Sequence, residues 1–254
     1  MLTLAGKGAL VVGSKRIGGA VVHRLASEGV NLTVAYRNSY KEAVALQKAV
    51  ASQGSYLQLI QGDVSIEEEV QRILSSTIAN LGELSFVINL ASGFQRSPLD
   101  SLNSQAWDDA LSAAKGSYLL AIHAARAMEH NSGPTRGHIV LFGDWAASET
   151  PYKHYLPYLT AKAAIQFMVG AFAVELAPLG ILVNAIAPGP TIRPPEFPLK
   201  GWQQMVFQQT PLRRESSAQE MAEFIVTLLK SETITGETIR VDSGRHLAGP
   251  GLTR

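Results

Sequence analysis

Short apolar runs alternate along the chain with segments whose apolar residues recur at helical spacing. The runs lie at residues 9–12, 31–36, 56–60, 84–88, 138–142, 181–186 and 237–241, and they have the length of buried strands. Helical spacing predicts helices at 20–25, 41–51, 104–130 and 217–229, after Ser65, and around Tyr158. Because strand–helix–strand units connect by right-handed crossovers, such strands run parallel in one sheet. The pattern predicts a single α/β domain over residues 1–254, with a doubly wound, mostly parallel seven-stranded sheet covered by helices on both faces.

Polar residues mark two further local features. Ser65 precedes three consecutive glutamates at 67–69, an order typical of a helix N-cap followed by acids in the first turn. We therefore interpret these acids as a solvated helix start and predict no metal site. The proline-rich segment 191–198 predicts a mobile loop before the helix at 217–229.

The composition narrows the class of protein. Hydrophobic residues make up 46% of the chain and charged residues 17%, which suits a packed core and argues against disorder. The net charge of +1, without a basic or acidic block, argues against nucleic acid and anionic membranes as partners. The absence of cysteine excludes disulfides, zinc–thiolate sites and a thiol nucleophile. Without a signal-peptide pattern or an apolar run of membrane-spanning length, we expect a soluble, cytoplasmic protein.

A glycine turn joins the first strand to the first helix. The stretch Gly13-Ser-Lys-Arg-Ile-Gly-Gly19 follows the apolar run at 9–12. A helix N-terminus approached this closely by the backbone is a natural seat for a pyrophosphate, as in Rossmann-type dinucleotide domains. The turn is not a full G-x-G-x-x-G, so an ordinary strand–helix turn explains it equally well.

The end of the second strand indicates which dinucleotide would bind. In a dinucleotide fold this strand end meets the adenosine ribose, where an acid accepts a hydrogen bond from the 2′-hydroxyl of NAD. Here the strand ends in Tyr36-Arg-Asn-Ser39, with Lys15 and Arg16 in the neighbouring turn. Basic side chains suit a 2′-phosphate, so we predict NADP(H); the alternative is a solvated turn.

Tyr158 and Lys162 form the strongest candidate for chemistry. They stand four residues apart in an apolar helical segment and should share one helix face. An ammonium near a phenol stabilises the phenolate, lowers the tyrosine pKa and makes the hydroxyl a usable proton donor near neutrality. The alternative is an amphipathic helix that happens to carry both residues.

Residues of special chemistry also gather at the predicted strand ends. Ligands of doubly wound sheets bind outside the carboxyl ends of the strands. The residues at these ends are Gly13, Arg37, Asp63, Asn89, Asp144 and Pro188. Their convergence favours a functional site over a chance arrangement.

Over essentially its whole length the chain resembles the short-chain dehydrogenase/reductase family. The matching pieces are the glycine turn, Asp63-Val, Asn89-Leu-Ala, Tyr158-x-x-x-Lys162, Asn184-Ala-Ile-Ala-Pro-Gly189, Ile234-Thr-Gly236 and Val241-Asp-x-Gly244. The resemblance implies hydride transfer between a nicotinamide and a carbonyl or imine. It implies that Tyr158 acts as the acid and that Lys162 holds the ribose and tunes Tyr158. It also suggests a homotetramer, with the helices at 104–130 and 158–173 at an interface.

Three departures from that family pattern are informative. The usual Thr-Gly opening of the glycine turn is Val11-Val12, with Gly13 one place later and Arg16 where a glycine is common. The helical asparagine of the catalytic set is Ala113 or Ala114, and the serine after the fifth strand is Asp144. Together with Ser92 and Phe94, these changes resemble the pteridine reductase branch, where the aspartate assists protonation and the phenylalanine stacks on the pterin.

The resemblance then assigns the residues of the site. The catalytic residues are Asp144, Tyr158 and Lys162. The substrate-binding residues are Arg16, Ser92, Phe94, Asp144 and Tyr158. The cofactor-binding residues are Gly13, Ser14, Lys15, Arg16, Ile17, Tyr36, Arg37, Asn38, Ser39, Asp63, Val64, Asn89, Ala91, Ser92, Tyr158, Lys162, Pro188 and Gly189.

Three functions remain open at this stage. The leading hypothesis is an NADPH-dependent reductase of a small pteridine-like or other nitrogen heterocycle, because an ionised carboxylate at 144 accepts hydrogen bonds and cannot donate one to a ketone. The second is a carbonyl reductase, such as a 3-oxoacyl thioester reductase, with an unusual residue in the serine place. The third is a dinucleotide-binding sensor without catalysis, against which the intact Tyr158–Lys162 pair argues. For Phe94, the alternative to stacking on a substrate ring is ordinary core packing. For Asp144, the alternative to a catalytic role is a drifted, poorly active site.

Overall fold

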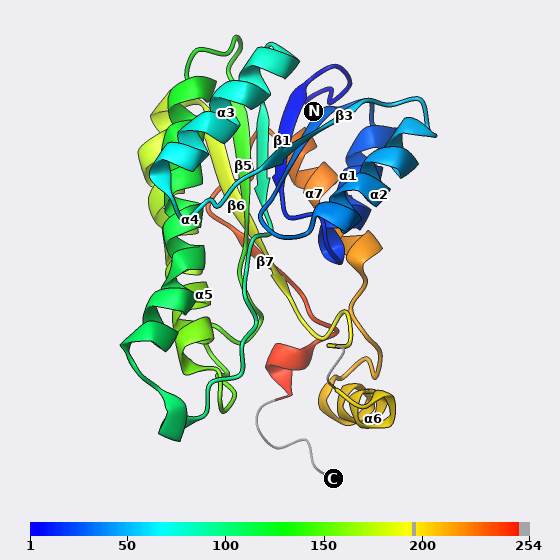
Figure 1. Ribbon diagram of the computed structural model, residues 1–254, viewed down its shortest axis with the longest axis vertical. Helices are drawn as coiled ribbons and strands as arrows, with labels where there is room; N and C mark the ends of the chain where they lie inside the picture. Colours follow the sequence, from blue (N-terminus) through cyan, green and yellow to red (C-terminus); the bar gives the residue numbers. More distant parts are fainter. Residues whose placement is uncertain (195–196, 249–254) are drawn as a thin grey trace.

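A seven-stranded parallel sheet forms the centre of the computed structural model, which describes residues 1–194 and 197–248 (Figure 1). The strand order is β3-β2-β1-β4-β5-β6-β7, and each neighbouring pair is parallel. The strands are β1 (Gly8–Val12), β2 (Asn31–Tyr36), β3 (Leu57–Gln61), β4 (Phe86–Asn89), β5 (Gly137–Phe142), β6 (Ile181–Pro188) and β7 (Thr238–Val241). The prediction of one α/β domain around a seven-stranded parallel sheet is confirmed.

Helices cover both faces of this sheet. They are α1 (Ile17–Ser27), α2 (Tyr40–Ala51), α3 (Glu67–Leu81), α4 (Ser104–Met128), α5 (Leu156–Leu176), α6 (Leu199–Gln209) and α7 (Ala218–Lys230). Figure 1 shows α3, α4 and α5 on one side of the sheet and α1, α2 and α7 on the other. Successive residues of a strand point to opposite faces, so Leu10 and Val12 pack in one core cluster while Ala9 and Val11 pack in the other.

Helix boundaries follow local chemistry. Asn103 caps α4 by accepting a hydrogen bond from the amide of Ala106 at 2.9 Å, and Ser217 caps α7 through the amide of Glu220 at 3.2 Å. Helix α1 begins at Ile17, inside the glycine turn and earlier than the apolar pattern at 20–25 predicts. This start brings the backbone amides of its first turn to the carboxyl edge of the sheet.

The predicted cap at Ser65 is wrong. The N-cap residue of α3 is Ile66, and no side chain caps it. The Ser65 hydroxyl instead donates to Asp63 Oδ1 at 2.7 Å, and the Ser65 amide donates to the same oxygen at 2.9 Å. Asp63 therefore competes successfully for the serine and fixes the turn after β3.

The structure adds one helix that the sequence did not predict. Helix α6 lies between the predicted loop at 191–198 and the predicted helix at 217–229, and it buries only Trp202 and Val206. So few apolar positions give a weak helical pattern, which is why the sequence missed it. Of the segment predicted as a mobile loop, residues 195 and 196 lie outside the described residues.

Helix α5 contradicts the expectation that no segment reaches membrane-spanning length. With the turn η2 (Ala177–Leu179) it forms a 24-residue segment, Leu156–Leu179, that by length and composition alone is long and apolar enough to cross a membrane. Its inner residues Ile165 and Val169 are buried in the core against β5 and β6. Helix α5 therefore has the length and composition of a membrane-spanning helix, and in this structure its inner face packs against the sheet as part of the core.

Candidate active site

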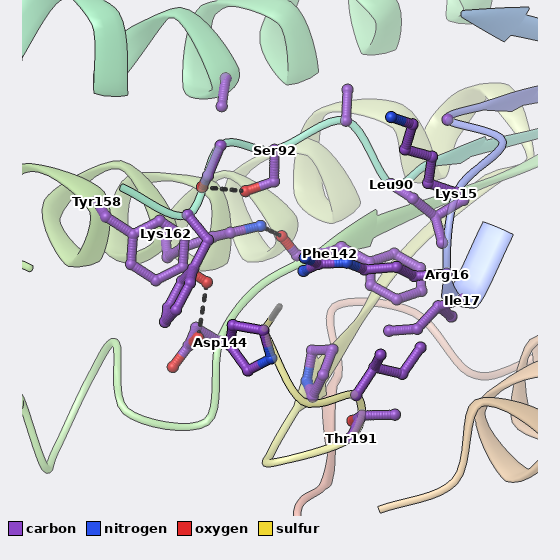
Figure 2. Close-up of a pocket in the computed structure, with 18 of the residues that line it drawn as sticks. Lys15, Arg16, Ile17, Leu90, Ser92, Phe142, Asp144, Tyr158, Lys162 and Thr191 are labelled. Carbon is purple, nitrogen blue, oxygen red and sulfur yellow. Dashed lines mark hydrogen bonds between the residues drawn. The ribbon is translucent and has the colours of Figure 1, made fainter. Parts of the chain in front are cut away.

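A cavity of about 860 Å³ opens along the carboxyl edge of the sheet. The glycine turn, the ends of β2, β4, β5 and β6, helix α5 and helix α6 all contribute to its lining. Figure 2 shows Lys15, Arg16 and Ile17 on one side of this space and Asp144, Tyr158 and Lys162 on the other. With one exception, every residue that the sequence assigned to the site lines this cavity.

The exception is Asn89, which was predicted to contact the cofactor. Its side chain is buried under the loop that follows β4, where its amide donates to the Ser117 hydroxyl at 3.0 Å. Its Oδ1 accepts a hydrogen bond from the backbone amide of Ala91 at 3.0 Å. Asn89 therefore shapes the loop that carries Ala91 and Ser92 into the cavity, and it does not line the cavity itself.

The glycine turn forms the phosphate side of the cavity. Gly13 has φ 105°, a conformation that favours glycine, and a Cβ on Gly18 would stand 2.1 Å from the Gly13 carbonyl oxygen. This close packing lets the turn approach a ligand. Helix α1 starts there with no capping side chain and no acid in its first turn, so its amides and dipole are available to an anion. The residues present thus fit a dinucleotide pyrophosphate.

Arg16 adopts an unusual backbone conformation in this turn. Its φ of 56° and ψ of −115° lie in a region that glycine enters readily and other residues enter at a cost of about 1–3 kcal/mol. The sequence has arginine at a position where the family that it resembles commonly has glycine. A residue held in a strained conformation at the edge of a cavity is a candidate for a functional role.

The end of the cavity beside β2 is rich in cations that already have acidic partners. Arg37 pairs with Asp63 at 3.2 Å, and Lys15 pairs with Glu42 at 2.8 Å. The two cations are more than half exposed, so each pair is weak and can exchange for a ligand phosphate. The Ser39 hydroxyl lies 2.8 Å from that of Ser14, at the same end of the cavity.

At the other end, Asp144 and Tyr158 are joined directly. The Tyr158 hydroxyl donates to Asp144 Oδ2 at 2.7 Å, as Figure 2 shows. The Tyr152 hydroxyl lies 3.5 Å from the same oxygen, while Asp144 Oδ1 accepts the backbone amide of Ala146 at 2.9 Å. Two phenols and one carboxylate therefore share one buried polar cluster.

Lys162 is buried beside this cluster. Its ammonium donates to the carbonyl oxygen of Phe142 at 2.7 Å and lies 5.9 Å from the centroid of the Tyr158 ring. Burial lowers the pKa of Lys162 to about 8, while the charge of Asp144 acts in the opposite direction. The sequence thus correctly places Lys162 and Tyr158 near one another at the cavity.

The effect on Tyr158 is opposite to the one expected from Lys162 alone. Burial, and then the negative charge of Asp144, raise the pKa of Tyr158 well above its usual value. Burial also raises the pKa of Asp144, against the lowering effects of Ala146, Tyr158 and Lys162. The raised pKa keeps the Tyr158 phenol protonated near neutral pH, and both Asp144 oxygens accept hydrogen bonds, as those of an ionised carboxylate do.

Comparison with known proteins agrees with this geometry. A family model described as Enoyl-(Acyl carrier protein) reductase matches residues 11–246, most of the chain. The chain belongs to the short-chain dehydrogenase/reductase family. It is therefore an oxidoreductase of that family.

Relatives in this family are named for different substrates. Glucose 1-dehydrogenase of Gluconobacter oxydans is 29% identical over 96% of this chain and 94% of its own length. The 3-oxoacyl-(acyl-carrier-protein) reductase FabG of Staphylococcus aureus is 29% identical over 95% and 98% of the two chains. The structure of FolM alternative dihydrofolate reductase 1 from Brucella canis, complexed with NADP, is 27% identical, with a TM-score of 0.87 over 98% of each chain. These relatives share the family and the fold with this chain, but their names point to different substrates.

Several residues that line the cavity escaped sequence reasoning. The aromatic residues Trp145, Tyr152 and Tyr155 line the cavity, and so does Arg245. Phe94, which the sequence did predict, stacks on Tyr155 at 4.6 Å between ring centroids. Arg245 follows the Val241-Asp-x-Gly motif directly, and that adjacency was the one available signal for it.

Proposed function

We propose that this chain is an NADPH-dependent reductase that transfers hydride to a C=N or C=O bond of a pteridine-like nitrogen heterocycle. The observation that carries the proposal is the carboxylate of Asp144, 2.7 Å from the Tyr158 hydroxyl. A serine hydroxyl in this place could donate to a ketone oxygen, whereas an ionised carboxylate only accepts. A substrate that presents ring N–H or amino groups therefore complements the site better than a simple ketone.

The preference for NADP(H) over NAD(H) rests on charge. Lys15, Arg16 and Arg37 line the adenosine end of the cavity, and strand β2 ends without an acid that could accept from a ribose 2′-hydroxyl. A 2′-phosphate would compete with Asp63 for Arg37 and with Glu42 for Lys15. A phosphate carries up to two negative charges and several acceptor oxygens, so it binds these cations more strongly than a single carboxylate does. Replacement of the carboxylates by a 2′-phosphate therefore favours NADP(H) over NAD(H).

Each residue of the cluster then has a role in the reduction. The bound cofactor supplies the hydride. The Tyr158 hydroxyl supplies the proton to the substrate, and Asp144, in contact with that hydroxyl, takes up a proton from the solvent and passes it to the phenolate, which restores the phenol. Lys162 keeps a positive charge beside both groups. Phe94 offers a flat face for the ring, next to Tyr158 at 5.1 Å between centroids.

The second candidate is a carbonyl reductase, favoured by the relative named as a 3-oxoacyl reductase. Replacing one residue separates the two. Asp144→Ser should lose NADPH oxidation with dihydropterins and gain some with ketones, because the new hydroxyl can donate to a carbonyl. Tyr158→Phe is the matched control, since it should lower turnover by a factor of about 100 or more with either substrate. Dihydropterin reduction that survives Asp144→Ser would favour the carbonyl reductase.

We also propose a cytoplasmic homotetramer, with no nucleic acid or membrane as partner. Its support is an apolar outer face on α4 and α5, where Phe167 is 80% exposed, Val174 is 75% exposed, and Trp107 and Tyr118 are about half exposed. Such large apolar side chains in one region commonly mark an interface. Light scattering on the parent and on Phe167→Glu tests this: a tetramer that Phe167→Glu dissociates supports it, and a monomeric parent contradicts it.

A further inference from the structure

Arg245 is a cation in the cavity wall that none of the catalytic roles above uses. It begins the short turn η3 (Arg245–Leu247) just after β7. Its guanidinium lies over the ring of Trp145, 4.5 Å from the ring centroid, and its Nη2 donates to Gln209 Oε1 at 2.9 Å. Trp145 and Gln209 line the cavity too. Arg245 is thus positioned by an aromatic face on one side and an amide on another.

A continuous aromatic wall leads from the proton donor to this cation. Tyr158 lies 6.3 Å from Tyr155, Tyr155 lies 5.1 Å from Tyr152, and Tyr152 lies 5.8 Å from Trp145, all between ring centroids. Arg245 stands at the far end of this wall. A ligand that follows this row of rings with its reacting ring at Tyr158 would therefore carry its other end toward Arg245.

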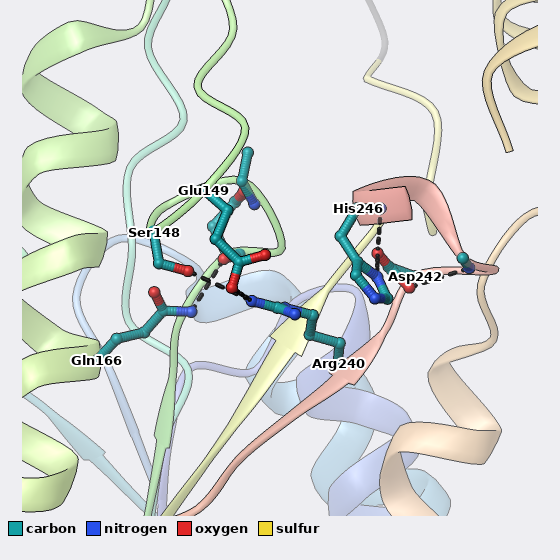
Figure 3. A network of polar contacts seen from close by, with 9 residues as sticks. Ser148, Glu149, Gln166, Arg240, Asp242 and His246 are labelled. Carbon is teal, nitrogen blue, oxygen red and sulfur yellow. Dashed lines mark hydrogen bonds and ion pairs between the residues drawn. The ribbon is translucent and has the colours of Figure 1, made fainter. Parts of the chain in front are cut away.

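The backbone that presents Arg245 is held firmly in place. The buried carboxylate of Asp242 accepts hydrogen bonds from the amides of Gly244 and His246, at 3.0 and 2.8 Å. It also contacts His246 Nδ1 at 2.7 Å, as Figure 3 shows. Because both ends of this tight turn are tied to one carboxylate, Arg245 is pre-organised and does not hang loosely from the chain terminus.

The placement of Arg245 differs from that of the basic residues at the adenosine end. Lys15 lies in the glycine turn and Arg37 directly follows β2, across the sheet from β7. Arg245 instead shares a wall with Trp145, which follows Asp144 in the chain. Burial lowers the pKa of the Arg245 guanidinium, with the Asp242 charge acting in the opposite direction, so the site keeps a partly desolvated cation on the substrate side.

We propose that Arg245 binds a carboxylate at the end of the substrate remote from the reacting ring. The inference rests on the proposed function and sharpens it: the substrate is a nitrogen heterocycle joined by a flat arm to an anionic tail. A guanidinium matches a carboxylate in geometry and charge, and a partly desolvated one binds it more strongly than an exposed one does. Arg245 is accordingly a specificity-determining residue, with Trp145 and Gln209 holding it in position.

The experiment compares two dihydropterins that differ in charge. Dihydrofolate carries carboxylates on a flat arm, whereas dihydrobiopterin has a short neutral side chain. For Arg245→Gln, KM for dihydrofolate should rise about tenfold or more with kcat little changed, because a charge-assisted contact remote from the reacting bond is lost. KM for dihydrobiopterin and the dissociation constant of NADPH should stay at their parent values. Arg245→Lys, which retains the charge, should fall between the parent and Arg245→Gln.

Arg240→Gln is the matched control. Arg240 lies five residues away, pairs with Glu149 at 2.7 Å and does not line the cavity, so its loss should leave both KM values unchanged (Figure 3). The proposal is wrong if Arg245→Gln raises both KM values equally, if it changes neither KM value, or if it weakens NADPH binding instead. The pteridine assignment would stand in each of these cases. An Arg245→Gln effect seen only with acetoacetyl-CoA would assign Arg245 to a phosphate and overturn the proposal as well. A parent protein that reduces neither dihydropterin refutes the proposed function itself.

Discussion

The short contact between Asp144 and Tyr158 predicts that Asp144 controls the ionisation of Tyr158. Asp144→Asn keeps the size of the side chain and an oxygen that can accept the phenol hydrogen bond, but it removes the charge. The variant should therefore keep the fold while the pKa of Tyr158 falls. The pKa stays above the value of a free phenol, because burial is the larger cause of the increase and remains in the variant.

The size of the effect follows from the geometry. The phenol and carboxylate oxygens are 2.7 Å apart, which places the centres of the two delocalised charges a little farther away. Two unit charges about 4 Å apart repel by about 4 kcal/mol at an effective dielectric constant of about 20. Loss of the Asp144 charge should remove this repulsion, so that Tyr158 ionises at a distinctly lower pH in the variant than in the parent.

Ultraviolet absorbance of tyrosinate measures this change without knowledge of the substrate. Each protein is titrated against its own Tyr158→Phe counterpart, so that the difference signal reports Tyr158 alone, and circular dichroism confirms that the fold persists at each pH. The Asp144→Asn protein should show the Tyr158 signal well before alkaline unfolding, and the parent should not.

Tyr152→Phe serves as the control. It removes the other phenol near Asp144, whose contact of 3.5 Å is long, and should move the Tyr158 titration much less. If the parent and Asp144→Asn titrate Tyr158 at the same pH, the carboxylate does not govern the phenol. The proposed proton relay through Asp144 would then be wrong.

Three further changes test other parts of the structure. Arg37→Asp should narrow or reverse the preference for NADPH over NADH, measured as dissociation constants by fluorescence titration; equal constants in the parent would contradict the assignment of the adenosine end. Arg16→Gly should raise the free energy of unfolding by about 1 kcal/mol in denaturant melts by relieving a strained φ, and should weaken NADPH binding; unchanged stability would mean the turn is not strained. Burial, aided by Lys7, lowers the pKa of His138 to about 4, so about 3 kcal/mol of stability should be lost as the pH falls from about 6.5 to about 4. His138→Leu should remove that pH dependence, and a parent melt that is flat over this range would contradict the burial of a neutral imidazole.

The sign of the His138 effect follows from linkage. In the unfolded chain the imidazole binds a proton below about pH 6.5, whereas the folded chain resists protonation until about pH 4. The unfolded state therefore takes up more protons within this window, and stability rises with pH across it. Both ring nitrogens of His138 are buried without a hydrogen-bond partner, which explains why a charge there is so unfavourable.

Sequence reasoning reached most of the fold because the strands are buried on both faces. Strands such as β1, with all five residues buried, give continuous apolar runs that are easy to distinguish from the helices between them. The weakly apolar helix α6 gives no such contrast. The Ser65 cap failed because the same sequence suits an N-cap and a turn around Asp63, and only the three-dimensional contacts decide between them.

Most of the site was likewise predictable, because parallel strands bring their carboxyl ends to one edge. Arg245 was not, since it reaches the cavity from a turn whose course depends on the contacts of Asp242. A carboxylate near Tyr158 already argues from the sequence for a protonated phenol. The structure adds the 2.7 Å contact with Asp144 and the burial of the ring, which raise the pKa of Tyr158.

NADPH consumption by the unmodified protein tests the central claim most directly. The oxidation of NADPH is followed separately with dihydrobiopterin, dihydrofolate and acetoacetyl-CoA, and Tyr158→Phe is run beside the parent to identify turnover at this site. The account predicts reduction of the dihydropterins at a higher kcat/KM than the thioester, with loss of that activity in Tyr158→Phe. Turnover of acetoacetyl-CoA alone, or dihydropterin reduction that persists in Tyr158→Phe, would contradict it.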